Sequence, residues 1–182
     1  PSLPQDSQGE MYPVANVSWY DAVIFCNAKS KALGLDTVYE YIGLETSISG
    51  HVTKLIDLKI NYNILGVRLP TEAEWMYAAS GSEGFLYPVQ NQNDSIDNYA
   101  WYSLNSGGHC HTVGELLPNH FGLFDMAGNL LEWTNDWKGT LPDTPVSDYI
   151  GSSTIGNESE KVVKGGCYFL GKEYLNISVR SI

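Results

Sequence analysis

Three cysteines are the residues of this chain whose side chains could act as nucleophiles or redox centres. They are widely separated, at Cys26, Cys110 and Cys167. Cys167, a lone thiol between the pair Gly165-Gly166 and Tyr168, could serve as a redox or nucleophilic residue. An odd number of widely spaced cysteines fits neither a disulfide framework nor a CxxC zinc site. We therefore expect structural thiols, with at most one bridge within the chain.

Imidazole and thiol groups lie side by side in the run His109-Cys110-His111, which follows Ser106-Gly107-Gly108. Both groups are good ligands for zinc or copper. Neighbouring side chains of a strand point to opposite faces, so adjacent positions are poorly suited to chelate one ion. We favour a turn after Ser106 over a transition-metal site, although the metal site stays open as an alternative.

Glu72 and Glu74 form a carboxylate pair that could look catalytic. Thr71 precedes them, and Glu74 lies three residues later, which is the pattern of a capping box at the start of a helix. Acidic residues in the first turn of a helix more often interact with the helix dipole than with a substrate. We therefore predict a helix that begins after Thr71, with Trp75 and Ala79 on its apolar face.

A second capping pattern lies near the start of the chain. Ser18 can cap a helix whose third residue is Asp21, and Trp19 and Cys26 fall on one apolar face before Gly34 ends it. Cys26 is therefore expected in the core.

Composition limits the classes of protein to which the chain can belong. Its 182 residues, 43% of them hydrophobic, suffice for one domain with a substantial core. The net charge of -11 repels phosphate backbones, so a nucleic-acid partner is not expected. The chain contains no run of 18 apolar residues, so we expect no transmembrane segment.

Beyond residue 80 the sequence indicates turns and short apolar runs. Short strands are predicted at Thr37–Tyr41, Ala100–Tyr102 and Val162–Cys167, and a compact loop at Phe121–Trp137. The polar composition of Leu141–Glu160 predicts an exposed, irregular loop. Buried loop backbone needs hydrogen-bond partners, and oxygen-rich loops can obtain them by binding calcium.

Four separated segments carry a resemblance to a known family: Pro13–Ala22, Val67–Trp75, Gly122–Trp137 and Val163–Tyr168. Their order and spacing resemble the formylglycine-generating enzyme family, also called the sulfatase-modifying-factor family. The resemblance implies an α+β fold of the C-type-lectin-like kind, with two main helices, short strands and much irregular structure. We expect residues 13–182 to form this domain, and residues 1–12 to be an extended arm or linker.

The resemblance also marks where a redox centre would lie. In the catalytic oxidases of the family, two cysteines hold copper, at the third and eighth positions after the motif serine. Cys167 stands at the serine position here, so those two positions are Leu170 and Leu175. A leucine side chain offers no donor atom. The sequence therefore favours a non-catalytic binding domain over its alternative, an enzyme of this family with altered oxidoreductase chemistry.

A calcium site is implied by the same resemblance. One calcium site of the family uses two side chains and two backbone carbonyls, which match Asp125, Gly128, Leu130 and Glu132. All of the expected oxygen ligands are present. The alternative is that Asp125 and Glu132 only accept hydrogen bonds from loop amides.

The C-terminal segment is the expected binding surface, for a protein or a small-molecule ligand. Some relatives carry a deliberately diversified segment at this place, and the residues here are compatible with one. The expected ligand-binding residues are Cys167, Tyr168, Phe169, Leu170, Tyr174 and Leu175.

Both ends of the chain are shorter than is usual for the family. We expect missing flanking segments, or a partner chain, to supply further strands. The acidic charge and these short ends weakly favour an extracytoplasmic or cell-surface location.

Overall fold

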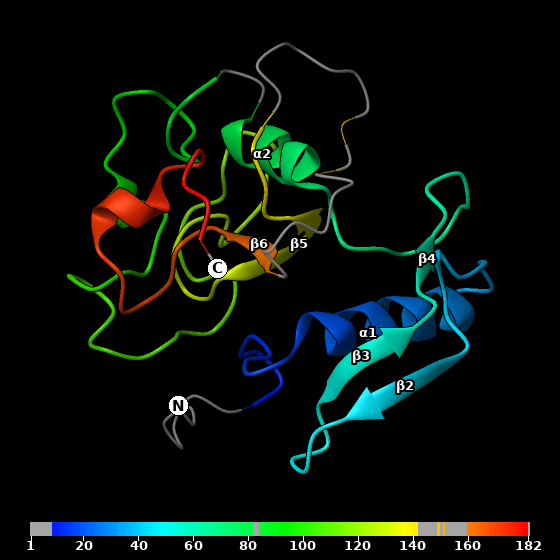
Figure 1. Cartoon of the computed structure of the whole chain (residues 1–182). Helices are drawn as coiled ribbons and strands as arrows, with labels where there is room; N and C mark the ends of the chain where they lie inside the picture. The colour runs from blue at the N-terminus through cyan, green and yellow to red at the C-terminus, as the bar shows by residue number, and fades with distance from the viewer. Residues whose placement is uncertain (1–8, 82–83, 142–148, 150, 152–159, 182) are drawn as a thin grey trace. The chain divides into compact units, whose positions relative to one another are not determined.

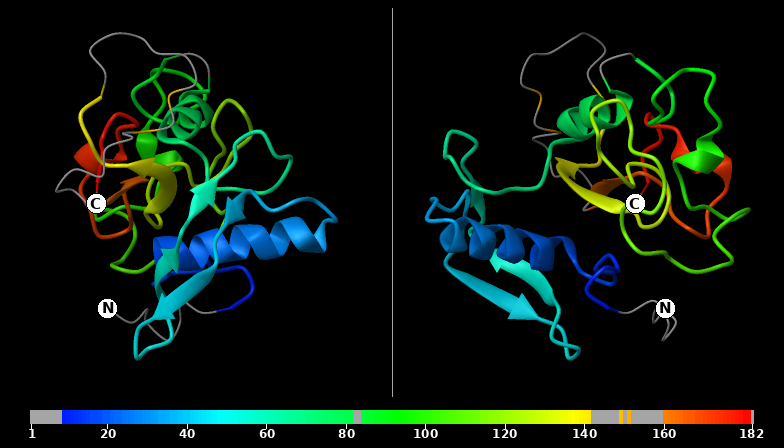
Figure 2. Two further views of the ribbon diagram at one scale, coloured as in Figure 1. Left: turned by 45° about the vertical axis from the view of Figure 1, so that its right-hand side comes forward. Right: turned by 180° about the vertical axis from the view of Figure 1, so that it is seen from behind.

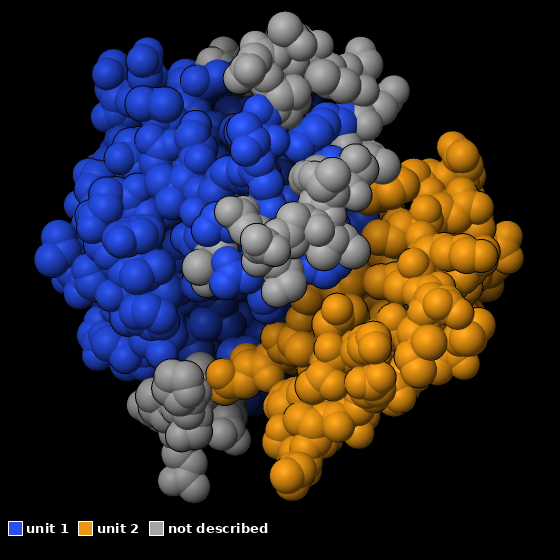
Figure 3. All heavy atoms as spheres, in the orientation of Figure 1, with its two compact units in different colours: residues 1–15, 70–182 blue, residues 16–69 orange. Residues whose placement is uncertain are grey.

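The computed structural model describes residues 9–81, 84–141, 149, 151 and 160–181. The chain forms two compact units, which Figure 3 shows in different colours. One unit consists of residues 16–69, and the other of residues 1–15 and 70–182. Within the described part of the chain, neither α-helix has the length and apolar character needed to span a membrane.

In the unit of residues 16–69, helix α1 covers Trp19–Ala32 and begins as predicted. The Ser18 hydroxyl accepts a hydrogen bond from the Asp21 N–H at 3.0 Å, and the Asp21 carboxylate accepts one from the Ser18 N–H at 2.9 Å. The predicted capping box is confirmed. Trp19 and Cys26 lie on the buried face, also as predicted.

Strands β2 (Gly43–Thr46) and β3 (Val52–Ile56) form an antiparallel hairpin that the sequence analysis did not predict. Helix α1 lies alongside β3, as Figures 1 and 2 show. Strand β1 (Tyr39–Glu40), within the strand expected at residues 37–41, pairs with β4 (Lys59–Ile60).

In the unit that contains residues 70–182, helix α2 covers Glu72–Ser80. The Thr71 N–H donates to the Glu74 carboxylate at 2.8 Å, and the Glu74 N–H donates to the Thr71 hydroxyl at 3.2 Å. This second predicted capping box is also confirmed. Trp75 lies on the buried face of the helix.

Strands β5 (Glu132–Trp137) and β6 (Lys161–Lys164) form the antiparallel pair of the same unit. The predicted compact loop at residues 121–137 is therefore wrong for its last six residues. The register shifts between Trp133 and Trp137, and three consecutive residues, 134–136, are buried. This irregularity removes the alternation by which a strand is recognised in a sequence.

The other predicted segments have separate outcomes. Of the strand expected at residues 162–167, residues 162–164 lie in β6, whereas the chain turns at Gly165-Gly166. The strand expected at residues 100–102 is reduced to a single bridge between Trp101 and Gly128. Most of the irregular loop expected at residues 141–160 lies outside the described residues. Two short 3-10 helices, η1 (Ile96–Asn98) and η2 (Lys172–Leu175), complete the unit.

Candidate functional site

The turn at Gly165-Gly166 holds the start of the C-terminal segment against η2. Both glycines have positive φ, at 91° and 72°. A Cβ atom on Gly166 would lie 2.9 Å from Cδ2 of Leu175 and 3.0 Å from the carbonyl oxygen of Tyr174. Because those distances are shorter than van der Waals contact, only glycine fits here. The turn therefore fixes where Cys167 and Leu175 lie.

Cys167 lies in the interior, with 1% of its surface exposed. Burial raises the pKa of its thiol, although backbone N–H groups of Phe169 and Leu170 partly oppose the shift. A thiol with a raised pKa is a poor nucleophile because the thiolate is the reactive form. Cys26 and Cys110 are also buried, and none of the three cysteines forms a disulfide, which agrees with the expectation of structural thiols.

Leu175, at the second copper-cysteine position of the family, is part of the core. It is 1% exposed and packs in a cluster that includes Val89, Ile96 and Tyr102. Leu170, at the first position, is half-buried. Hydrocarbon therefore occupies both positions at which the resemblance would place sulfur.

Four of the six expected ligand-binding residues reach the surface. Phe169 is 59% exposed and Tyr174 is 40% exposed, while Tyr168 and Leu170 are half-buried. The rings of Tyr168 and Phe169 meet edge to face, with centroids 5.1 Å apart. The other two expected residues, Cys167 and Leu175, face the core and cannot contact a ligand at the surface. Their burial follows from the close packing at Gly166, which the sequence pattern did not reveal.

The backbone of this segment is held by hydrogen bonds from elsewhere in the unit. The Tyr168 N–H donates to the Asn129 carbonyl at 2.9 Å, and the Ser106 hydroxyl donates to the Tyr168 carbonyl at 2.7 Å. The Ser103 N–H donates to the Leu170 carbonyl at 3.0 Å. None of these bonds uses the side chain of Tyr168 or Leu170. The position of this backbone therefore does not depend on hydrogen bonds from the side chains of Tyr168 and Leu170.

Asn129 is a supporting residue to which the sequence analysis assigned no role. Its side chain accepts a hydrogen bond from the His111 N–H at 2.9 Å and donates one to the His111 carbonyl at 3.1 Å. Its backbone has a φ of 57°, a value that asparagine tolerates better than most residues. The pair Gly128-Asn129 could have indicated this turn in the sequence, because glycine and asparagine adopt positive φ more readily than other residues.

The turn favoured above lies at Gly107-Gly108, directly before the histidine run, and both glycines have positive φ. The His111 ring stacks on the Trp101 ring, with centroids 3.8 Å apart, and the His109 ring stacks on the His111 ring, with centroids 4.5 Å apart. One His111 ring nitrogen lies 2.8 Å from the Ser106 carbonyl. In the described part of the chain, no three side chains of His, Cys, Asp or Glu gather closely enough to hold a metal ion.

The expected calcium ligands lie around the start of β5. The Glu132 carboxylate accepts a hydrogen bond from the Trp75 indole N–H at 2.6 Å. Burial, and next the negative charge of Asp125, raise the pKa of Glu132 to about 6, while the Trp75 bond opposes the shift. Asp125 accepts a hydrogen bond from the Gly114 N–H at 2.8 Å, which is the loop-amide contact that the alternative expected.

Buried charges that the sequence analysis did not predict lie between α2, β5, β6 and the C-terminal residues. Glu72, 4% exposed, has carboxylate oxygens 3.5 Å from the Lys164 ammonium and 2.9 Å from the Arg180 guanidinium. Its backbone N–H donates to the Asp136 carboxylate at 2.7 Å. Burial lowers the pKa of Lys161 to about 7, and the charge of Asp136 opposes that shift. Glu72 is thus an ion-pair partner, a role beyond the helix dipole.

Comparison with known proteins gives the family. The model of the sulfatase-modifying factor enzyme 1-like domain matches residues 2–181. The chain belongs to this family. The α+β fold predicted from the sequence is therefore confirmed, with its two helices, short strands and formylglycine-generating-enzyme-like architecture.

The relatives of this chain include a protein named as a chaperone and proteins named as enzymes. The chain is 36% identical over 166 residues to "Chaperone protein LppX" of Paenibacillus barcinonensis, with 78% of this chain and 58% of that protein covered. It is 33% identical over 125 residues to the formylglycine-generating enzyme of Streptomyces coelicolor, with 61% and 39% covered. The chain thus spans less than two thirds of the length of either relative.

Among solved structures, the chain is similar to Treponema denticola variable protein 1. The TM-score is 0.79 at 31% identity, with all of this chain and 69% of that chain covered. The similarity thus extends over both units of the chain.

Proposed function

We propose that this member of the sulfatase-modifying-factor family is a non-catalytic binding domain. The observation that carries the proposal is the hydrocarbon at Leu170 and Leu175, together with the burial of the Cys167 thiol, which raises its pKa. A copper-thiolate centre needs soft sulfur ligands, which neither leucine supplies. The relatives named a chaperone and a variable protein are consistent with binding roles on this scaffold.

The binding surface consists of the side chains of Tyr168, Phe169, Leu170 and Tyr174. Aromatic side chains bury much area at a small cost in conformational entropy, and they are enriched at the centres of interfaces. Because the hydrogen bonds from other segments end on main-chain atoms of Tyr168 and Leu170, the side chains of these two residues can change without loss of those bonds. The surface is therefore suited to a diversified sequence that binds different protein or small-molecule ligands.

Binding through this surface is tested by screening the purified chain on glycan and peptide arrays and measuring the affinity for the strongest ligand. Phe169→Ala is expected to weaken that affinity by about tenfold or more, because it removes an exposed aromatic anchor. Phe25→Ala, which removes an aromatic residue that is 67% exposed on α1, is the matched control. Equal affinities of the wild-type chain and Phe169→Ala would place the interface elsewhere.

Calcium is proposed to stabilise the loop before β5. The donor set is hard oxygen, which calcium prefers: the carboxylates of Asp125 and Glu132 and the carbonyls of Gly128 and Leu130. Burial, and to a smaller extent the negative charge of Asp125, raise the pKa of Glu132, and a divalent cation would compensate the buried negative charge. Calcium binding to the folded state would then add stability by mass action.

The calcium proposal predicts a stabilisation that depends on pH. In saturating calcium, at about 100 times the dissociation constant, the chain gains about 2.7 kcal/mol, or a Tm increase of several degrees. Without calcium, the raised pKa of Glu132 contributes stability that is complete below pH 4.5 and is lost as the pH rises through about 6. Calcium needs the ionised form, so its affinity increases as the pH rises through that value.

The measurement is the Tm in calcium and in EDTA at pH 5 and pH 7. Glu132→Gln should abolish the calcium response, whereas Glu40→Gln, with the same change of charge at an exposed position, should keep it. A wild-type Tm that is the same in calcium and in EDTA at pH 7 would rule out the site.

A further inference from the structure

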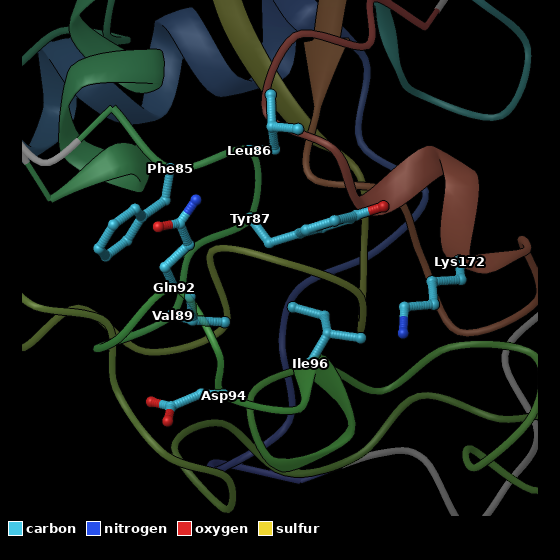
Figure 4. Close-up of a pocket in the computed structure, with 8 residues that line it drawn as sticks. All are labelled: Phe85, Leu86, Tyr87, Val89, Gln92, Asp94, Ile96 and Lys172. Atoms are coloured by element: carbon cyan, nitrogen blue, oxygen red, sulfur yellow. The ribbon is translucent and has the colours of Figure 1, made fainter.

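A pocket of about 290 Å³ lies between the loop of residues 85–96 and the start of η2. Figure 4 shows the side chains that line it. Its volume is close to the lower end of the usual range for small-molecule pockets, roughly 300–1,000 Å³. It shares no lining residue with the aromatic surface of Tyr168, Phe169, Leu170 and Tyr174.

The inner wall of the pocket is apolar and belongs to the core. Val89 and Ile96 are 4% and 2% exposed, and both belong to the core cluster of Leu175. The ring of Tyr87 lies across the pocket above them in Figure 4. An apolar ligand placed here would exchange water for close contact with packed hydrocarbon.

Hydrogen bonds within the protein fix the loop that lines the pocket. The Leu86 carbonyl accepts from the Ile177 N–H at 2.9 Å, which fixes the loop to the C-terminal residues. The Asp94 carboxylate accepts from the Asn91 N–H at 3.0 Å and from the Tyr99 hydroxyl at 2.6 Å. A pocket already held in shape binds with a smaller loss of conformational entropy.

Lys172 supplies the positive charge of the pocket. Figure 4 shows its side chain on the same side as the Tyr87 hydroxyl. Among the described residues its ammonium group makes no hydrogen bond or ion pair, although its charge helps, after the Tyr102 hydroxyl, to lower the pKa of Asp97. The Asp94 carboxylate, by contrast, already accepts hydrogen bonds. Figure 4 shows Asp94 and Lys172 at opposite sides of the pocket, so a negative group is attracted at the Lys172 side alone. A single ammonium group offers one ion pair, which suits a ligand with one negative charge better than a dianion.

We propose that this pocket binds a small organic monocarboxylate. Its aromatic or aliphatic body lies against Val89, Ile96 and the Tyr87 ring, and its carboxylate pairs with the Lys172 ammonium. The site is separate from the aromatic surface proposed above, so either can fail without the other.

The test is a titration of the full chain with 3-phenylpropionate, followed by the methyl NMR signals of Val89 and Ile96. The neutral analogue 3-phenylpropan-1-ol is titrated in parallel. The carboxylate is expected to bind about tenfold more tightly than the alcohol, because a charge-assisted hydrogen bond is stronger than a neutral one. Lys172→Met should remove that difference. Lys31→Met, with the same change of charge in the other unit, should retain it.

Three results would overturn the proposal. The first is that neither compound shifts the Val89 and Ile96 signals at concentrations up to about 10 mM. The second is that the alcohol binds as tightly as the carboxylate, or that Lys172→Met leaves the carboxylate affinity unchanged. The third is that Phe169→Ala abolishes the shifts, because the ligand would then lie on the aromatic surface.

Discussion

Glu72→Gln is expected to destabilise the chain by about 3 kcal/mol, because it removes the negative partner of two buried cations. Lys164 has a fully buried side chain, and Arg180 is mostly buried. Loss of the carboxylate charge leaves their positive charges uncompensated where water cannot solvate them. The change should be measured as the free energy of unfolding in urea, with tryptophan fluorescence as the signal.

Glu74→Gln is the matched control for this prediction. It makes the same change of charge two residues further along α2, at an exposed position. Glutamine can also complete a capping box, so the expected cost is below about 0.5 kcal/mol. A cycle of Glu72→Gln with Lys164→Gln should be less than additive, because Glu72→Gln leaves Lys164 without its carboxylate partner and Lys164→Gln leaves Glu72 with Arg180 alone. Equal stabilities of Glu72→Gln and Glu74→Gln would show that the buried pair contributes nothing.

The two helices could be predicted because their start signals are local. At Ser18 and at Thr71, a side chain three residues later completes the capping box, and both boxes are present in the structure. Such signals depend on neighbouring residues alone, so a sequence displays them directly. Strand β5 differs, because its shifted register and its three consecutive buried residues arise from tertiary packing.

The candidate site was also predictable only in part, because some of its features are local in the sequence and others depend on tertiary packing. The order of the family motifs located the C-terminal segment and the substitutions at Leu170 and Leu175. Which of its side chains reach the surface depends on the Gly166 turn, which packs Leu175 inward and leaves Phe169 exposed. The charges around Glu72 were equally hidden, because their partners come from elements distant in the sequence.

The pocket beside Lys172 gave no sequence signal at all. Its residues belong to a loop without periodicity and to a short 3-10 helix. Only the fold brings Lys172 to the edge of an apolar cavity built on Val89 and Ile96. Surface chemistry of this kind is therefore found from a structure and not from a motif.

The replacement of the redox pair by hydrocarbon predicts the complete absence of formylglycine generation. The thiol of Cys167 is buried and has a raised pKa, so it remains protonated near neutral pH. A single such thiol supplies neither the two thiolates that hold Cu(I) nor an exposed nucleophile. The expected effect is therefore a loss of the whole reaction and not a reduced rate.

The most direct test loads the purified full chain with Cu(I), removes the unbound metal, and measures both the copper content and the oxidation of a cysteine-containing sulfatase peptide by mass spectrometry. The formylglycine-generating enzyme of Streptomyces coelicolor, treated identically, serves as the positive control. We predict that this chain retains no stoichiometric copper and that the peptide cysteine stays reduced. One copper ion per chain, with peptide oxidation that Cys167→Ser abolishes, would contradict the account.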